Sequence, residues 1–151
     1  MSADARRQAA MLVRLREVRM NSAASALAVA RAETLRAEQA RAHADAASID
    51  AEGAYRQSRD RLADDPNEAE RLLAVVDRMR FAQSVARSAL NDAREAERLC
   101  VAAETARRKT MIIARARHDI LAERAAAARR AVARANEDRS AEEVDESRRM
   151  R

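Results

Sequence analysis

The fold is decided by the stretch from residue 69 to residue 135, which reads AERLLAVVDRMRFAQSVARSALNDAREAERLCVAAETARRKTMIIARARHDILAERAAAARRAVARA. Alternate steps of three and four from Ala69 reach twenty positions, and fifteen of them hold apolar residues. An apolar repeat sustained over about nine heptads is typical of a coiled-coil helix. The positions are Ala69, Leu72, Val76, Met79, Gln83, Ala86, Leu90, Ala93, Glu97, Cys100, Glu104, Arg107, Met111, Ala114, His118, Leu121, Ala125, Ala128, Val132 and Ala135. Because Glu97, Glu104 and Arg107 interrupt the repeat, we expect the middle of this seam to be loose.

The composition extends the helical interpretation to the whole chain. Ala, Glu, Lys, Leu and Arg make up 94 of the 151 residues, with 40 alanines and 29 arginines. Such a composition is typical of a long helix or coiled coil. One glycine, one proline, one phenylalanine, one tyrosine and no tryptophan exclude most sheet folds, which need frequent turns and aromatic or β-branched strands. With only 24 Leu, Ile, Val and Phe residues, a globular core and an enzyme pocket are not expected.

The sequence predicts one break, at Asp65-Pro66-Asn67-Glu68. These residues read as a helix start, with Asp65 as N-cap, Pro66 at the first helical position and Glu68 reaching back as a capping box. Residues 1–151 are therefore expected to form a single elongated, all-α, long antiparallel two-helix coiled-coil hairpin. Helix 1 is expected over about 5–62, the turn over about 63–66 and helix 2 over about 66–139, with a frayed tail over about 140–151. Gly53 is interpreted as a soft point in the first helix or a site of close contact, and a break there is the less favoured alternative.

The first helix shows a less regular apolar pattern than the second. Its large apolar residues fall into three short series whose phases differ, which predicts stutters in the supercoil. The series are Met11, Leu15 and Val18; Leu35, Ala42 and Ile49; and Tyr55 with Leu62. The expected register pairs residues whose numbers add to about 131. Alanine at many seam positions predicts close approach of the two helices and a modest stability.

Basic charge is concentrated at the open end of the expected hairpin. Residues 107–134 hold nine basic and two acidic groups, and the opposite residues 1–20 add five basic and two acidic groups. A surface of this sign suits an acidic partner. Two alternatives remain open at this point: a solvated charged face without a partner, and an arginine count that only reflects a GC-rich genome.

The only two aromatic residues, Tyr55 and Phe81, are expected near the turn. In the register above they fall within about 10–15 Å of each other. With Arg56 and Arg80 beside them, they form a composition typical of interface hot spots. The alternative is that both rings fill the seam near the turn.

No catalytic, metal or cofactor site is expected from the sequence. His43 and His118 lie on opposite arms and far apart in the expected register, and His118 is interpreted as a packing residue of the seam. The single cysteine, Cys100, gives no disulfide or metal-binding spacing and is interpreted as a small buried hydrophobe. The N-terminus lacks a signal-peptide pattern and the longest charge-free run is too short to span a bilayer, so a cytoplasmic protein is expected.

With these features the chain resembles the FliJ/YscO family of type III secretion stalk proteins. The resemblance covers the whole chain and rests on its length, hairpin architecture and charge pattern. Its residues are the N-terminal Arg6…Arg16-Glu17 helix, Tyr55-Arg56 before the turn and Phe81 after it, and the acidic-then-basic tail 142–149. Flagellar members have more aromatic residues at the tip, so the departure here favours the injectisome branch, which serves virulence or symbiosis.

The resemblance implies a non-enzymatic central stalk in the cytoplasm, at the base of a membrane secretion apparatus. The open end would dock into the hexameric export ATPase, and the tip would reach the cytoplasmic domain of the export gate; secretion chaperones are further implied partners. The ATPase-facing residues would be Arg6, Arg7, Arg14, Arg115, Arg117, Arg124, Arg129 and Arg130. Tyr55, Arg56 and Phe81 would face the gate.

A second interpretation belongs to another class of protein. A coiled-coil oligomerisation or nucleoid-associated protein would bind DNA through the basic stretch 107–134. The stretch lacks interleaved aromatic residues and any known reading motif, and it holds a single lysine, which makes nucleic acid the less favoured partner.

Overall fold

The computed structural model describes residues 3–64 and 66–150, without the side chains of residues 3, 4, 6 and 66. It consists of α1 (Ala3–Asp64), a 3₁₀ segment (Pro66–Glu68) and α2 (Ala69–Arg149). The expected all-α two-helix hairpin is thus confirmed: the helices pack against each other, and the described residues contain no strand. A chain with so much alanine and arginine, and with one glycine and one proline, has few places at which a helix can stop.

The helix ends differ from the expected ones on both sides of the turn. The turn contains a 3₁₀ segment, so α2 begins at Ala69 and not at Pro66. Glu68 pairs with Arg71 at 3.3 Å, one turn ahead of it, while the predicted N-cap Asp65 lies outside the described residues. At Gly53 the helix continues without a positive φ, and a Cβ would meet nothing within 4 Å. The glycine is therefore neither a break nor a close contact.

The chain divides into two compact units, each built from parts of both helices. Unit 2 is the turn-proximal hairpin of residues 28–106. Unit 1 combines residues 1–27 with residues 107–151. The two units are described separately below.

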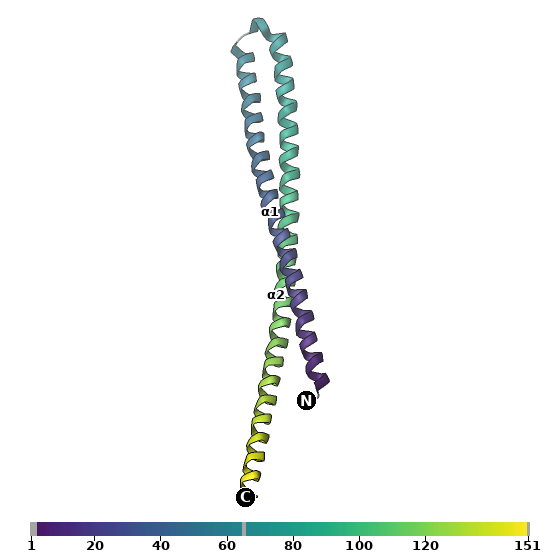
Figure 1. The fold of residues 1–151 in the computed structure, drawn as a ribbon. Helices are drawn as coiled ribbons and strands as arrows, with labels where there is room; N and C mark the ends of the chain where they lie inside the picture. Colours follow the sequence, from purple (N-terminus) through teal and green to yellow (C-terminus); the bar gives the residue numbers. More distant parts are fainter. Residues whose placement is uncertain (1–2, 65, 151) are drawn as a thin grey trace. The chain divides into compact units, whose positions relative to one another are not determined.

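In unit 2 the two helices lie side by side and run in opposite directions from the turn (Figure 1). Leu90 of α2 and Ala30 of α1 form its buried apolar core, and Thr34 and Ser58 are the buried polar residues. Both hydroxyls are satisfied within their own helix: Thr34 Oγ1 donates to the Ala30 carbonyl at 3.0 Å, and Ser58 Oγ to the Tyr55 carbonyl at 2.8 Å. Small residues therefore line a narrow seam, and the two buried hydroxyls bond to carbonyls of their own helix.

The seam predicted for α2 agrees with the side-chain exposure. Eighteen of its twenty positions are buried or half-buried, and only Arg107 and Ala135 are exposed. The prediction succeeded because the apolar repeat of this helix keeps one phase throughout.

Two of the three apolar series predicted for α1 are wrong in phase, whereas the third, Tyr55 with Leu62, lies in the seam. The five large aliphatic residues of the first two series lie outside the seam, and Ala42 is exposed as well; their exposed fractions are 70% for Met11, 46% for Leu15, 62% for Val18, 55% for Leu35 and 64% for Ile49. The half-buried and buried residues instead include one series with steps of four and three and no stutter. Ala24, Ala26, Asp45 and Glu52 are half-buried outside this series, and Ala5 precedes it. The series is Ala9, Val13, Arg16, Met20, Ala23, Leu27, Ala30, Thr34, Ala37, Arg41, Ala44, Ser48, Ala51, Tyr55, Ser58 and Leu62.

Ion pairs between the helices accompany this phase of α1. In unit 2, Arg41 Nε lies 2.7 Å from Glu97 Oε2, and Arg31 Nε lies 3.6 Å from Glu104 Oε1. The two carboxylates that interrupt the seam of α2 are therefore paired with arginines of α1. The Arg41–Glu97 pair is close, but it lacks hydrogen-bond geometry at Nε.

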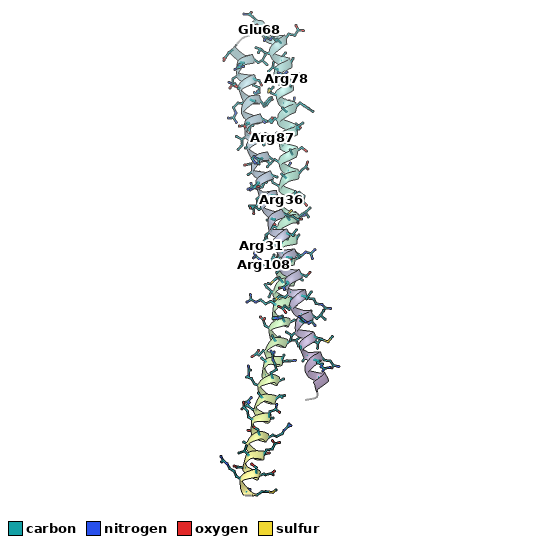
Figure 2. The ribbon with its side chains drawn as sticks, viewed as in Figure 1. Arg31, Arg36, Glu68, Arg78, Arg87 and Arg108 are labelled. Carbon is teal, nitrogen blue, oxygen red and sulfur yellow. The ribbon has the colours of Figure 1, made fainter. Side chains whose placement is uncertain are left out.

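The same pairs correct the register. The residue numbers of Arg31–Glu104, Arg41–Glu97 and Asp45–Arg94 add to 135, 138 and 139, whereas the sequence predicted about 131. The 3₁₀ segment accounts for part of the shift, because it delays the start of α2 by three residues. Arg31 and Arg36 lie on the part of unit 2 away from the turn, whereas Glu68 lies at the turn (Figure 2).

Unit 1 is packed more thinly. Leu27 is its buried apolar residue, at 8% exposure. In α2 every residue from 133 to 149 is exposed, and the helix nevertheless continues to Arg149, ten residues beyond the expected end near 139. Alanine, glutamate and arginine are good helix formers, which favours this continuation over the expected frayed tail.

Candidate partner-binding surfaces

Unit 1 carries the basic charge of the chain. It holds 18 basic and 10 acidic residues, whereas unit 2 holds 12 and 15, so their formal net charges are +8 and −3. A concentration of one sign raises the local potential and attracts partners of the opposite sign. The net charge of +5 for the whole chain therefore comes entirely from unit 1.

The eight arginines expected to face an ATPase all belong to unit 1. Seven have exposed side chains, and the side chain of Arg6 lies outside the described part of the chain. Arg115 makes a long pair with Asp119, 3.8 Å between Nε and Oδ2, and its side chain is still 69% exposed. The seven are Arg7, Arg14, Arg115, Arg117, Arg124, Arg129 and Arg130. They are available to a partner without disrupting the packing between the helices.

A small apolar hollow lies between the two helices of unit 1. Its volume is about 140 Å³. Alanines on both helices leave this space, because a methyl group cannot fill the gap between two helix backbones. The hollow is lined by Ala9, Leu12, Leu121, Arg124, Ala125 and Ala128. It is an apolar recess with one of the predicted arginines at its edge.

Large apolar side chains on the outside of unit 1 are the functional candidates that sequence reasoning missed. Met11, Leu15 and Val18 were assigned to the seam, but they lie on the outer face of α1. The signal was present in their spacing of four and three residues. That spacing indicates an apolar stripe on one face of α1. It does not show whether this face or another packs against α2.

The three residues expected to face the export gate belong to unit 2, but they do not form one cluster of rings. Tyr55 is half-buried in the seam, with the Arg59 guanidinium carbon 6.0 Å from its ring centre. Phe81 is 71% exposed, outside the seam. The observed register sets Phe81 opposite residues 54–58, and so at the level of Tyr55. Arg56 is exposed and pairs with Glu52 at 3.3 Å.

The histidines and the cysteine have structural surroundings. His118 is half-buried in the seam, and its Nδ1 lies 3.0 Å from Asp119 Oδ1. Cys100 is a half-buried free thiol at a seam position, as expected. Among residues 3–64 and 66–150 no group of three or more His, Cys, Asp or Glu side chains could hold a metal ion.

Known proteins give no guide to these surfaces. No protein-family model, no curated protein and no solved structure matches this chain. Over the residues that the structure describes, neither helix contains a segment apolar enough to cross a membrane. The function must therefore be argued from the hairpin and its charge.

Proposed function

We propose that this chain is a non-enzymatic central-stalk component of a type III secretion export apparatus, similar to the FliJ/YscO family. The observation that carries the proposal is the separation of charge on a two-helix hairpin, +8 on unit 1 and −3 on unit 2. A hairpin that presents its basic part to one partner and its turn to another suits a stalk between two bodies.

Unit 1 would dock into the hexameric export ATPase through its exposed arginines. Arginines on an exposed helix surface pair with carboxylates in bidentate geometry, and they steer association before contact. Such a contact would promote assembly of the hexamer, and its strength would fall as salt rises. The partner apparatus places the protein in the cytoplasm, at the base of a membrane complex.

The ATPase contact can be tested by charge reversal. Purified chain is mixed with its cognate export ATPase at low salt, and hexamer formation and ATP turnover are measured. We expect Arg129→Glu with Arg130→Glu to abolish the stimulation, because both side chains are exposed in unit 1. The matched control is Arg78→Glu with Arg80→Glu, two exposed arginines of unit 2 (Figure 2 shows Arg78). Equal stimulation by the wild type and both variants, or no stimulation at all, would refute the contact.

The gate contact rests on the exposed ring of Phe81. We expect Phe81→Ala to weaken binding to the cytoplasmic domain of the export gate and to reduce secretion, since an exposed aromatic ring beside arginines is a typical hot spot. Leu73→Ala is the control, because Leu73 is an exposed apolar residue of the same unit, at 50% exposure. Intact binding in the Phe81 variant would remove this half of the proposal.

Duplex DNA is the competing partner of unit 1. A mobility shift that persists above physiological salt, and that disappears with the Arg129 and Arg130 reversal, would favour the nucleoid-associated alternative.

A further inference from the structure

An unpartnered apolar stripe lies on the outer face of α1 in unit 1. Met11, Leu15 and Val18 are separated by four and three residues, and their exposed fractions are 70%, 46% and 62%. The seam residues of this segment, such as Val13 and Met20, lie on the other side of the helix. Residues spaced in this way can pack against a further helix, other than α2, as the a and d positions of a coiled coil do.

Arginines border the stripe on both sides. At 100° per residue, Arg14 and Arg19 lie about 70° to either side of the line through Met11, Leu15 and Val18. Arg7 lies on the same side as Arg14, and all three side chains are exposed. Between residues 7 and 19 the only carboxylate, Glu17, lies about 130° from this line. Over this stretch the charged residues of the border, at e and g positions, are therefore all arginines.

The hollow described above is not part of this surface. It lies between the two helices of unit 1, where Ala9 of α1 and Leu121 and Ala125 of α2 line it. At 100° per residue, Ala9 lies on the side of α1 opposite the stripe. The stripe and its border of arginines are therefore the candidate docking surface.

We propose that unit 1 binds an acidic amphipathic helix of a partner protein through this stripe, with glutamates or aspartates of the helix against Arg7, Arg14 and Arg19. The proposal deepens the proposed function and rests on it for the identity of the protein that supplies the helix. Its new content is that apolar side chains, and not arginines alone, anchor the contact. Arginines at the border add specificity and speed of association.

Other occupants fit the surface less well. A second copy of the chain would bring two arginine borders against each other. This arrangement is unfavourable, because like charges that face each other across a coiled coil repel. Nucleic acid phosphates would leave the three apolar side chains in water. A membrane-surface helix has a broad apolar face, often with Trp or Phe, whereas this stripe is narrow and contains no aromatic residue.

Two synthetic peptides test the proposal on the full chain. Each has three heptads with leucine at a and d; one carries glutamate at e and g, and the other carries lysine there. We expect the glutamate peptide to bind at least about tenfold more tightly in a fluorescence anisotropy titration at low salt. We expect Leu15→Ser with Val18→Ser to weaken that binding by about tenfold, since two anchoring side chains are lost. Ile49→Ser is the matched control, because Ile49 is as exposed, at 64%, but lies in unit 2.

Several outcomes would overturn the proposal. These are equal binding of both peptides, unchanged binding in the Leu15 and Val18 variant, and tighter binding of the chain to phosphatidylglycerol vesicles than to the glutamate peptide. Sedimentation that shows a dimer abolished by the same variant would identify a second copy as the occupant instead. No ATPase is present in this assay, so failure of the peptide to bind does not contradict the proposed docking to the ATPase. In the same way, failure of the docking experiment does not change the peptide result.

Discussion

Units 1 and 2 use the same pair of helices in different ways. In unit 2, three ion pairs join the helices, and acidic residues slightly outnumber basic ones. In unit 1, basic residues outnumber acidic ones by eight, and large apolar side chains such as Met11 and Val18 point outward. The charged side chains of a helical pair can therefore form ion pairs between the two helices or remain exposed to a partner. Which of the two happens depends on the residues beside the seam.

The difference has an energetic side. Paired charges on half-buried positions stabilise the fold only when both partners remain, because removing one leaves the other desolvated. An excess of like charge does the opposite, since self-repulsion destabilises the compact state until an acidic partner binds. Unit 2 has the character of a self-contained hairpin, whereas unit 1 carries an excess of positive charge that its own carboxylates do not neutralise.

The largest expected effect concerns the one buried leucine of each unit. Leu90→Ala in unit 2 and Leu27→Ala in unit 1 should each lower the free energy of unfolding by about 2 kcal/mol, at the low end for buried leucine because the seam is only two helices thick. Hydrogen exchange should show the loss of protection within the unit that carries the change. The measurement thus asks whether the two units are separately cooperative.

Leu99→Ala is the control for this pair, since Leu99 is 55% exposed and alanine is an equally good helix former. It should leave exchange rates nearly unchanged. A loss of protection spread evenly over both units after Leu90→Ala would break the comparison, because the chain would then unfold as one body.

A smaller effect is expected from the Arg41–Glu97 pair. Its side chains are 39% and 23% exposed, and the atoms are 2.7 Å apart. A double-mutant cycle with Arg41→Ala and Glu97→Ala should give a coupling of about 1 kcal/mol, above the value for exposed pairs and below that for fully buried ones. Chemical denaturation of the four proteins measures it.

The Arg94–Asp45 pair offers a matched comparison in the same unit. It is longer, at 3.6 Å, and its side chains are 56% and 42% exposed, so its coupling should be smaller. A larger coupling for this pair than for Arg41–Glu97 would contradict the view that burial in the seam sets the strength of the ion pairs.

The sequence sufficed for the fold class and for one helix of the seam. The repeat from Ala69 to Val132 has one apolar phase, so amphipathicity alone located the buried face of α2. In α1 two phases compete: one holds Met11, Leu15 and Val18, and the other holds mostly small residues with Arg41. Apolar content favours the first, but the structure buries the second, in which Arg41 lies opposite the Glu97 carboxylate.

For the candidate surfaces, charge was easier to predict than shape. The placement of the arginines in unit 1 followed from counting along the chain, because an antiparallel hairpin brings its two ends together. The outer stripe and the hollow beside Leu12 did not follow, since both depend on the phase of α1. Phe81 and Tyr55 lie at one level in the observed register as well, because their numbers add to 136 and the ion pairs between the helices add to 135–139.

The smallest expected effect is a pH dependence on the surface of unit 2. Arg98 donates two hydrogen bonds to the exposed Glu95 carboxylate, from Nε at 2.7 Å and from Nη2 at 2.6 Å, and these bonds lower the pKa of Glu95. A lowered pKa in the folded state means that the ionised carboxylate favours folding. Its contribution is therefore complete above the ordinary glutamate pKa of about 4.3 and is lost as the pH falls through the lower folded value. An NMR titration of the Glu95 carboxyl carbon should place its midpoint below that of the same residue in Arg98→Ala. Identical midpoints would show that the Arg98–Glu95 pair does not persist in solution.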